Sequence, residues 1–267
     1  TVLNISRTHF FNYFARKKTL FPSCIRINPI RKPSSYVVTM VADTIIYHPT
    51  VLKLLRFLDS SPKREKSFRL VAYLSRFLAY YLQRRGFSHE LIKKFTDLKL
   101  HATFIRKGLR FLKPLNHLQA ASQAYDNKLM DRVLLLLTVV RNLGYAGYLT
   151  LDTVTFFKML GIVDKKKYSQ VPIWLARCWL VGLAAGVVHS LRTYSINTAK
   201  LAHTEEKDAG AALEHKIFTA KRKLVWDLLD MFICLNSLGA LHFSEGDIGF
   251  AGIVTSLMGL RDLWAAT

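Results

Sequence analysis

Three carboxylates near apolar segments form the acidic group whose spacing comes closest to supporting acid–base chemistry. Asp227 and Asp230 are three residues apart and would share one face of a helix, and Glu245 follows in the next segment. Paired carboxylates can act as general acid and base. Arg222 and Lys223 lie close by in the sequence, however, so salt bridges explain these acids without catalysis. We interpret the group as structural.

No other pattern in the sequence predicts a reaction. The chain has no GxSxG, no glycine-rich phosphate loop, no HExxH and no Cys/His cluster. Its cysteines, Cys24, Cys178 and Cys234, are scattered without a spacing typical of a metal site or a disulfide framework. The sequence therefore predicts no enzyme, no metal site and no cofactor.

The charge of the chain predicts an anionic partner. Lys and Arg number 39 against 18 acidic residues, for a formal net charge of +21, and 51% of the residues are hydrophobic. Such an excess is typical of proteins that bind nucleic acid or the anionic face of a membrane. Composition does not choose between the two, although no aromatic-rich RNA motif or zinc-finger spacing is present.

One segment, residues 91–113, combines an apolar line with a basic remainder. At about 100° per residue, seven apolar side chains fall on one side of a helix. The predicted membrane-binding residues are Leu91, Phe95, Leu98, Ile105, Leu109 and Leu112 on the apolar line, which also contains Ala102, and the cations Lys93, Lys94, Lys99, Arg106, Lys107, Arg110 and Lys113 around it. Such a helix can lie in a membrane interface, where apolar side chains enter the lipid and cations meet phosphates.

Three other interpretations of this helix stay open from the residues alone. An ordinary helix facing a protein core would show the same apolar line with a solvated basic back. The alternating spacing of four and three also fits a helix–helix seam, and a basic helix can lie on a nucleic-acid backbone.

Residues 171–191 form the best candidate for a membrane span. Twenty-one residues of helix cover about 30 Å, and this segment contains one arginine, Arg177, and one histidine, His189, but no Lys, Asp or Glu. Gly182 and Gly186 form a GxxxG that permits close helix packing. Residues 133–140 are also strongly apolar, but Arg141 and Asp152 follow on one face of the same helix and would have to be paired or face protein. We expect one or two spans.

The rest of the chain is also predicted to be mostly helical. Helices are predicted at about 51–58, 64–85, 89–113 with a disturbance at Pro114, 129–160, 172–198, 218–238 and 247–264. The predicted fold class is all-α, a membrane-associated helical bundle with amphipathic surface helices and one or two hydrophobic spans. Three regions are expected: residues 1–39, residues 40–128 with basic amphipathic helices, and residues 129–267 with apolar helices and a polar loop near 195–216.

The first region, residues 1–39, contains seven Lys and Arg and no acid. A mitochondrial presequence has that composition. A translated upstream extension ahead of a start at Met40 would also have this composition, and we expect the extension.

Ordered blocks from Met40 to Thr267 carry a resemblance to the fungal-type peroxin-eleven family of peroxisomal membrane proteins. They include residues 43–49 (DTIIYHP), 109–121 (LRFLKPLNHLQAA), 125–128 (YDNK), 178–180 (CWL), 226–227 (WD), 235–239 (LNSLG) and 262–267 (DLWAAT). The likeness is weakest over residues 1–39 and 165–168.

The resemblance implies that the protein elongates the peroxisomal membrane before fission, with residues 91–112 as the inserted helix. It implies three partners: an anionic phospholipid membrane, further copies of the chain in a homo-oligomer, and the dynamin-type fission machinery. It disfavours nucleic acid. A pore for small metabolites is the alternative function, and Arg141 with Asp152 is the charged pair that would line it.

Overall fold

The computed structural model describes residues 46–127, 131–164, 166, 168–203 and 207–267, and every regular element within these ranges is an α-helix. This confirms the predicted all-α fold. The helices are α2 (Pro49–Asp59), α3 (Ser61–Arg84), α4 (His89–Leu109), α5 (Lys113–Asp126), α6 (Arg132–Met159), α7 (Val171–Ala202), α8 (Lys207–Ser237) and α9 (Glu245–Ala265). The predicted leader, residues 1–39, lies outside the described residues.

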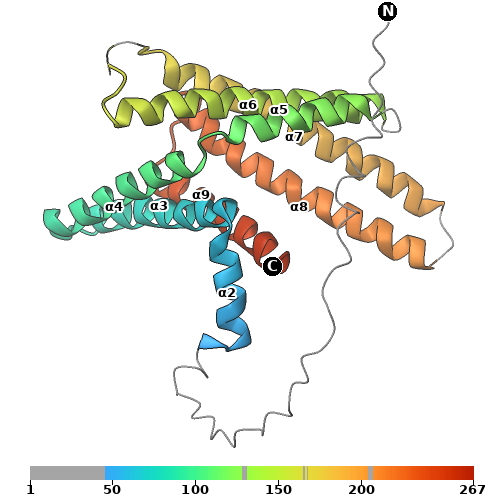
Figure 1. Ribbon diagram of the computed structural model, residues 1–267, viewed down its shortest axis with the longest axis horizontal. Coiled ribbons are helices and arrows are strands. Elements are labelled where there is room, and N and C mark those ends of the chain that lie inside the picture. Colours follow the sequence, from blue (N-terminus) through green and yellow to red (C-terminus); the bar gives the residue numbers. More distant parts are fainter. Residues whose placement is uncertain (1–45, 128–130, 165, 167, 204–206) are drawn as a thin grey trace, which may run out of the picture. The chain divides into compact units, whose positions relative to one another are not determined.

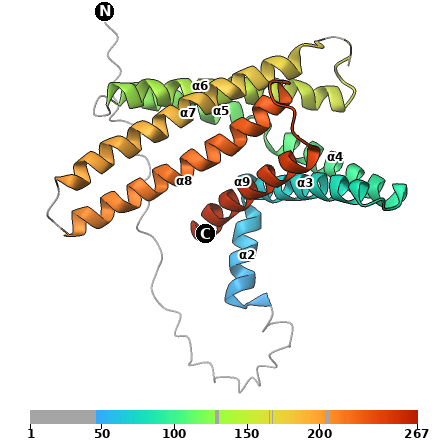
Figure 2. The same cartoon turned by 180° about the vertical axis from the view of Figure 1, so that it is seen from behind.

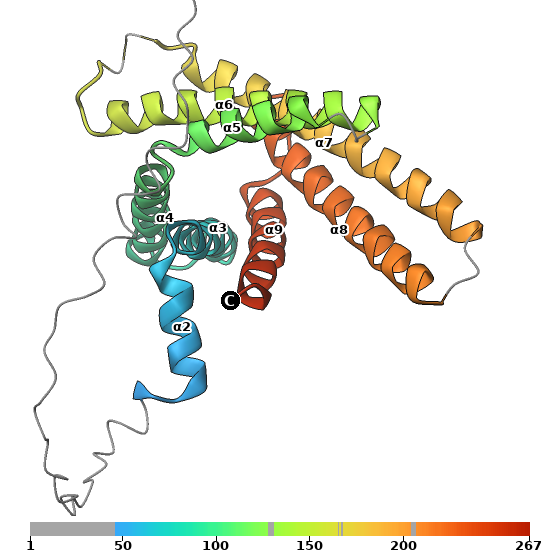
Figure 3. The same cartoon turned by 45° about the vertical axis from the view of Figure 1, so that its right-hand side comes forward.

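Two groups of helices make up the described part of the chain. In the first, α3 packs against α4, and α9, although last in the chain, packs on α3 (Figure 1). In the second, α5 lies on α6, α6 on α7 and α7 on α8; Figure 2 shows α7 and α8 side by side. The groups meet where α8 contacts α9 and where α4 contacts α6 (Figure 3).

Glycines allow α9 to lie close to α3. A Cβ added at Gly249 would be 2.9 Å from the backbone nitrogen of Phe77 and 3.0 Å from its Cα. One turn to either side, Gly246 and Gly252 face the rings of Tyr80 and Tyr73. The apolar, small-residue pattern of the final helix therefore serves packing within the chain.

The GxxxG motif of α7 also packs against another helix of the same chain. A Cβ added at Gly144 of α6 would lie 2.7 Å from the backbone nitrogen of Gly182, so the two helices meet at these glycines. A Cβ at Gly182 would meet the Arg141 carbonyl oxygen at 3.3 Å, and one at Gly186 would clash with the Arg141 guanidinium. Both glycines thus face α6 of the same chain rather than a free surface.

We expect Gly144→Ala to destabilise the α6–α7 pair by about 1–3 kcal/mol, because overpacking forces the backbones apart. Unfolding of the purified protein in detergent measures this. Gly210→Ala is the matched control: its nearest atom would be 3.9 Å away, so the change should be neutral or slightly stabilising. Equal stability of the two variants would contradict the packing account.

Several predicted helix boundaries were wrong. The third predicted helix, which was to reach Lys113, ends at Leu109, and Leu112 has a φ of 62° before α5 begins. Pro114 lacks an N–H and suits only the first turn of a helix, so the helix has to stop and restart there. The predicted polar loop near 195–216 is mostly helical, since α7 continues to Ala202 and α8 begins at Lys207.

The last helix begins slightly earlier than predicted. Ser244, not Asp247, is its N-cap residue, and the two side chains form a capping box in which each accepts a hydrogen bond from the other's backbone N–H. Other predicted ends hold: α3 and α8 stop two residues before Gly86 and Gly239, whose φ values are +73° and +75°.

Candidate membrane-binding surface and the ion pairs behind it

Helix α4 has the end charges that stabilise an isolated helix. Glu90 lies in its first turn and Arg106 and Lys107 in its last, so each charge opposes the dipole at its end. The chain then turns at Arg110, whose N–H donates to the carbonyl oxygens of Gly108 and Lys107. The helix is thus fixed at 21 residues, shorter than the predicted amphipathic segment.

The structure divides the predicted apolar line between protein and surface. Ala102 is buried, with 2% of its surface exposed, whereas Leu98 and Ile105 are 45% and 39% exposed. Leu91, Phe95 and Leu109 are half-buried. One side of α4 therefore faces the protein, and Leu98 and Ile105 remain exposed at its surface.

Helix α3 adds exposed apolar side chains beside those of α4. Val71 and Leu74 are 37% and 42% exposed. Counted at about 100° per residue, they lie roughly 160° and 140° around α3 from Arg69, a side chain that faces the protein interior. We call Val71, Leu74, Leu98 and Ile105 the outer face of α3 and α4.

One exposed cation borders this outer face: Lys94 lies about 20° around α4 from Ile105, whereas Lys93 lies about 140° from Leu98. Lys93 and Lys94 are exposed and make no ion pair among the described residues, and Lys99 is half-buried. An exposed apolar stripe next to an unpaired lysine is typical of an interfacial helix.

Five of the predicted membrane-binding residues are placed elsewhere. Leu112 and Lys113 lie beyond the end of α4, so they do not continue its apolar line or its basic face. Arg106, Lys107 and Arg110 point inward, where burial of their charges is offset by carboxylates. That part of the prediction was wrong because the spacing of residues around one helix does not show that acidic partners approach from other helices.

The inward cations form an ion-pair network that joins α3, α4 and α6. Arg106 Nε lies 3.3 Å from Glu65 Oε1, and Arg110 Nη2 lies 2.9 Å from Asp152 Oδ2. Lys107 pairs with the other oxygen of Asp152, and Arg110 Nη1 donates to the Tyr148 hydroxyl at 2.8 Å. The network fixes α4 against α6.

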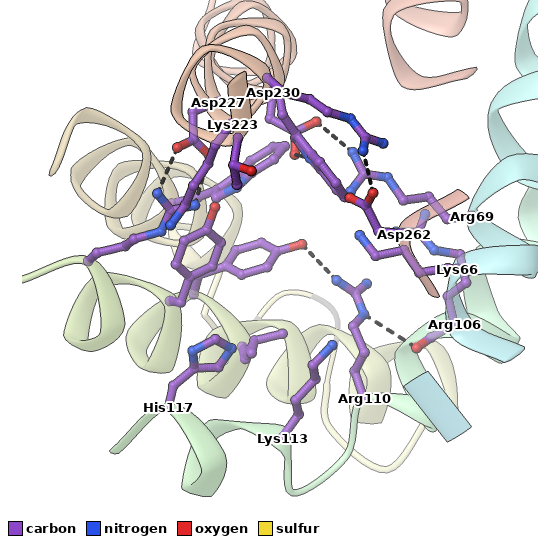
Figure 4. A pocket seen from close by; sticks show the side chains of 18 of the residues that line it. Lys66, Arg69, Arg106, Arg110, Lys113, His117, Lys223, Asp227, Asp230 and Asp262 are labelled. Atoms are coloured by element: carbon purple, nitrogen blue, oxygen red, sulfur yellow. Dashed lines mark hydrogen bonds and ion pairs between the residues drawn. The ribbon is translucent and has the colours of Figure 1, made fainter. Parts of the chain in front are cut away.

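A second set of pairs ties α8 to α3 and α6. Arg141 donates two hydrogen bonds to Asp227, at 2.7 and 2.8 Å, and Arg69 Nη2 lies 2.6 Å from Asp230 Oδ1 (Figure 4). Arg141 and Asp152 therefore share a face of α6, as predicted, but each pairs with a different helix and not with the other.

Each carboxylate of the acidic group forms a salt bridge with an arginine, although not with the partners that the sequence suggested. Besides the pairs of Asp227 and Asp230, Glu245 accepts two hydrogen bonds from Arg76, both 2.7 Å long. Arg222, the partner that sequence suggested, pairs instead with Asp262 at 2.5 Å. Among the described residues no group of His, Cys, Asp and Glu could hold a metal ion.

The network predicts a stability loss in acid. Burial alone would raise the pKa of Glu65, but Arg106 and Arg110 lower it to about 2 from an ordinary 4.5. Since the folded pKa lies below the unfolded one, Glu65 stabilises the fold above pH 4.5, and this contribution fades as pH falls toward 2. Glu65→Gln should lower the free energy of unfolding by roughly 3 kcal/mol at neutral pH.

The difference between wild type and Glu65→Gln should shrink toward zero as unfolding is measured at successively lower pH. The pH range in which it shrinks is set by the two pKa values, 4.5 and about 2. A difference that stayed constant from pH 7 to 3 would show that Glu65 does not titrate against Arg106 and Arg110.

The fold and its charges define the class of protein. Helices α6 and α7 are each long and apolar enough to cross a membrane, and Arg141 and Asp152 in the interior of α6 are paired toward other helices. Two such helices and an exposed apolar face beside a lysine are typical of helical membrane proteins.

Comparison with known proteins gives the family. Residues 51–264 match the family described as Peroxisomal biogenesis factor 11 (PEX11). The chain is 39% identical to Peroxisomal membrane protein PMP27 of Saccharomyces cerevisiae, over 85% of this chain and 100% of that protein. It is 37% identical to PMP30A of Candida boidinii, over 85% of this chain and 99% of the relative.

Identity to Peroxisomal biogenesis factor 11 of Schizosaccharomyces pombe is 25%, over 82% of this chain and 97% of that protein. No solved structure matches. The chain belongs to the PEX11 family and is a peroxisomal membrane protein. This confirms the resemblance seen in its sequence blocks.

Proposed function

We propose that this protein curves and elongates the peroxisomal membrane before fission, and so controls the number and size of the organelles. In this proposal the outer face of α3 and α4 enters one leaflet as a wedge. The observation that carries the proposal is the exposure of Leu98 and Ile105, 45% and 39%, next to the unpaired Lys94.

The energies are sufficient for binding at an interface. Full burial of a Leu or Ile side chain contributes about 1.5–3 kcal/mol, and each Lys near an anionic leaflet about 1 kcal/mol. Area added to one leaflet only favours curvature, because the other leaflet does not expand with it. The ion pairs behind α4 hold the helix in place, so insertion need not unfold it.

The proposal includes the partners that the family resemblance implies. The anionic lipid surface follows from Lys94 at the outer face, which forms no ion pair with a described residue. Self-association and engagement of dynamin-type fission machinery belong to the same proposal, since elongation precedes scission. The proposal does not include nucleic acid as a partner.

A metabolite pore is the weaker alternative. It required Arg141 and Asp152 to offer a polar stripe along α6, but Arg141 is bound to Asp227 and Asp152 to Lys107 and Arg110. Charges held in pairs between helices of one chain stabilise the fold rather than line a conducting path.

Purified protein added to anionic vesicles tests the wedge. Leu98→Glu with Ile105→Glu should abolish tubulation, because the changes remove apolar burial and place two negative charges against anionic lipid. Both side chains are exposed, so the fold should survive. Vesicle images and helicity by circular dichroism are recorded together.

The matched control is Leu100→Glu. Leu100 is 51% exposed on the same helix but lies about 160° around it from Leu98. It should tubulate as wild type does. Tubulation by the double variant, or its loss in the control alone, would rule out the outer face as the wedge.

A further inference from the structure

A cavity of about 650 Å³ lies where the two helix groups meet, on the inner side of α3 and α4. Helices α3 to α9 all contribute to its wall. Figure 4 shows Arg110, Lys113 and His117 on one side of it, Lys223 and Asp227 on the opposite side, and Lys66, Arg69 and Asp262 between them. The cavity is separate from the outer face of the proposed wedge.

Cations exceed carboxylates in the wall of this cavity. Five arginines line it, and each has a carboxylate partner: Arg69, Arg106, Arg110, Arg141 and Arg222. Three lysines also line it: Lys66, Lys113 and Lys223. None of these lysines forms an ion pair with a described residue.

Two of the three unpaired lysines are partly enclosed, whereas Lys223 is exposed at the edge of the cavity. Lys66 and Lys113 are half-buried, and Lys66 Nζ lies 4.8 Å from the centre of the Trp226 ring. Burial and the neighbouring Arg69 lower the pKa of Lys66 to about 7, which is the response of an ammonium group that lacks an anion. The pKa of Lys113 is also lowered, and burial is the main cause.

A buried donor points to a missing acceptor at the same place. Arg69 is only 8% exposed, and its Nε is a buried atom without a hydrogen-bond partner, although its Nη2 binds Asp230 and Thr255. Buried guanidinium donors are normally satisfied. Unpaired lysines and an unsatisfied arginine donor in one cavity call for a ligand with several acceptor oxygens and more than one negative charge.

The geometry points to a binding site in this cavity for a phosphorylated polyanion, held by Lys66, Lys113 and Lys223, with a ligand oxygen that accepts a hydrogen bond from the free Nε–H of Arg69. Phosphate oxygens match this set because ammonium and guanidinium groups bind them with charged hydrogen bonds. Tyr73, Tyr148 and Trp179 also line the cavity and offer apolar surface to the remainder of the ligand. A free phosphate compound and a phospholipid head group share this chemistry.

Binding is measured on the full chain in neutral detergent with two probes, inorganic pyrophosphate and dioctanoyl-phosphatidic acid. Lys66→Gln with Lys113→Gln should weaken binding of the active probe by roughly tenfold or more, since two charged contacts are lost. The same variant should melt at a higher temperature than wild type without a probe, because repulsion inside the cavity is relieved. Lys113→Gln alone repeats the test with a smaller change.

The control removes two cations from exposed positions, Arg132→Gln with Lys221→Gln. It should bind the probe as wild type does. Pyrophosphate binding assigns the site to a free phosphate compound, and binding of the lipid alone assigns it to a head group with its chains. Absence of binding by both probes, or an equal loss in the control variant, would overturn the proposal, and neither result depends on whether the outer face bends membranes.

Discussion

Cells whose only copy of this protein carries Leu98→Glu and Ile105→Glu should contain fewer, enlarged and unelongated peroxisomes. The two changes remove the apolar side chains that α4 contributes to the outer face, 45% and 39% exposed, without touching its ion pairs. The apolar helices α6 and α7 remain, so the protein should stay in the peroxisomal membrane. Fluorescence microscopy of a tagged copy measures location and organelle length together.

Leu100→Glu in the same cells is the reference, since it carries the same change at a site that is 51% exposed elsewhere on α4. Normal elongation is expected there. If the double variant also elongated peroxisomes normally, the wedge would be wrong. If it were degraded, the outer face would be a packing surface after all.

Breaking the pair between Arg141 and Asp227 should cause the largest loss of stability. Asp227 is 2% exposed and accepts both guanidinium hydrogen bonds, so Asp227→Leu leaves a charge inside the apolar part of α6. Loss of one partner of a buried pair costs about 3–5 kcal/mol, whereas replacing both partners by apolar side chains is often neutral or stabilising.

We therefore expect Arg141→Met and Asp227→Leu each to destabilise the protein severely in detergent unfolding, and the double variant to recover most of the loss. Arg192→Met is the control, because its pair with Asp131 lies on the surface, with side chains 47% and 30% exposed. It should change stability little. If the double variant lost as much stability as the two single variants together, the loss would come from packing and not from the ion pair.

Periodicity predicted the helices because each element is long and apolar on at least one side. It also predicted that Arg141 and Asp152 share a face of α6, since that follows from 100° per residue alone. It failed at Leu112 and Lys113, where the stop before Pro114 ends α4 early. A stricter use of the proline rule at this position would have found the break.

Charge was harder to place than hydrophobicity. The sequence shows Arg106 and Arg110 as part of a basic helix face, but their partners Glu65 and Asp152 are 41 and 42 residues away. Only the tertiary arrangement decides that these cations turn inward and that Lys93 and Lys94 remain outside. The sequence therefore predicted which types of residue form the outer face, but not which residues of the segment belong to it.

The depth of α4 in a bilayer tests the wedge most directly. A fluorescent label is attached at Leu98→Cys, Ile105→Cys or Leu100→Cys, each in a chain with Cys24 and Cys178 replaced by Ser; Cys234 is fully buried and can stay. The protein is placed in anionic vesicles that contain lipids brominated on their acyl chains. The account predicts strong quenching at positions 98 and 105 and weak quenching at 100. Labels at 98 and 105 that are no more quenched than the label at 100 would contradict it.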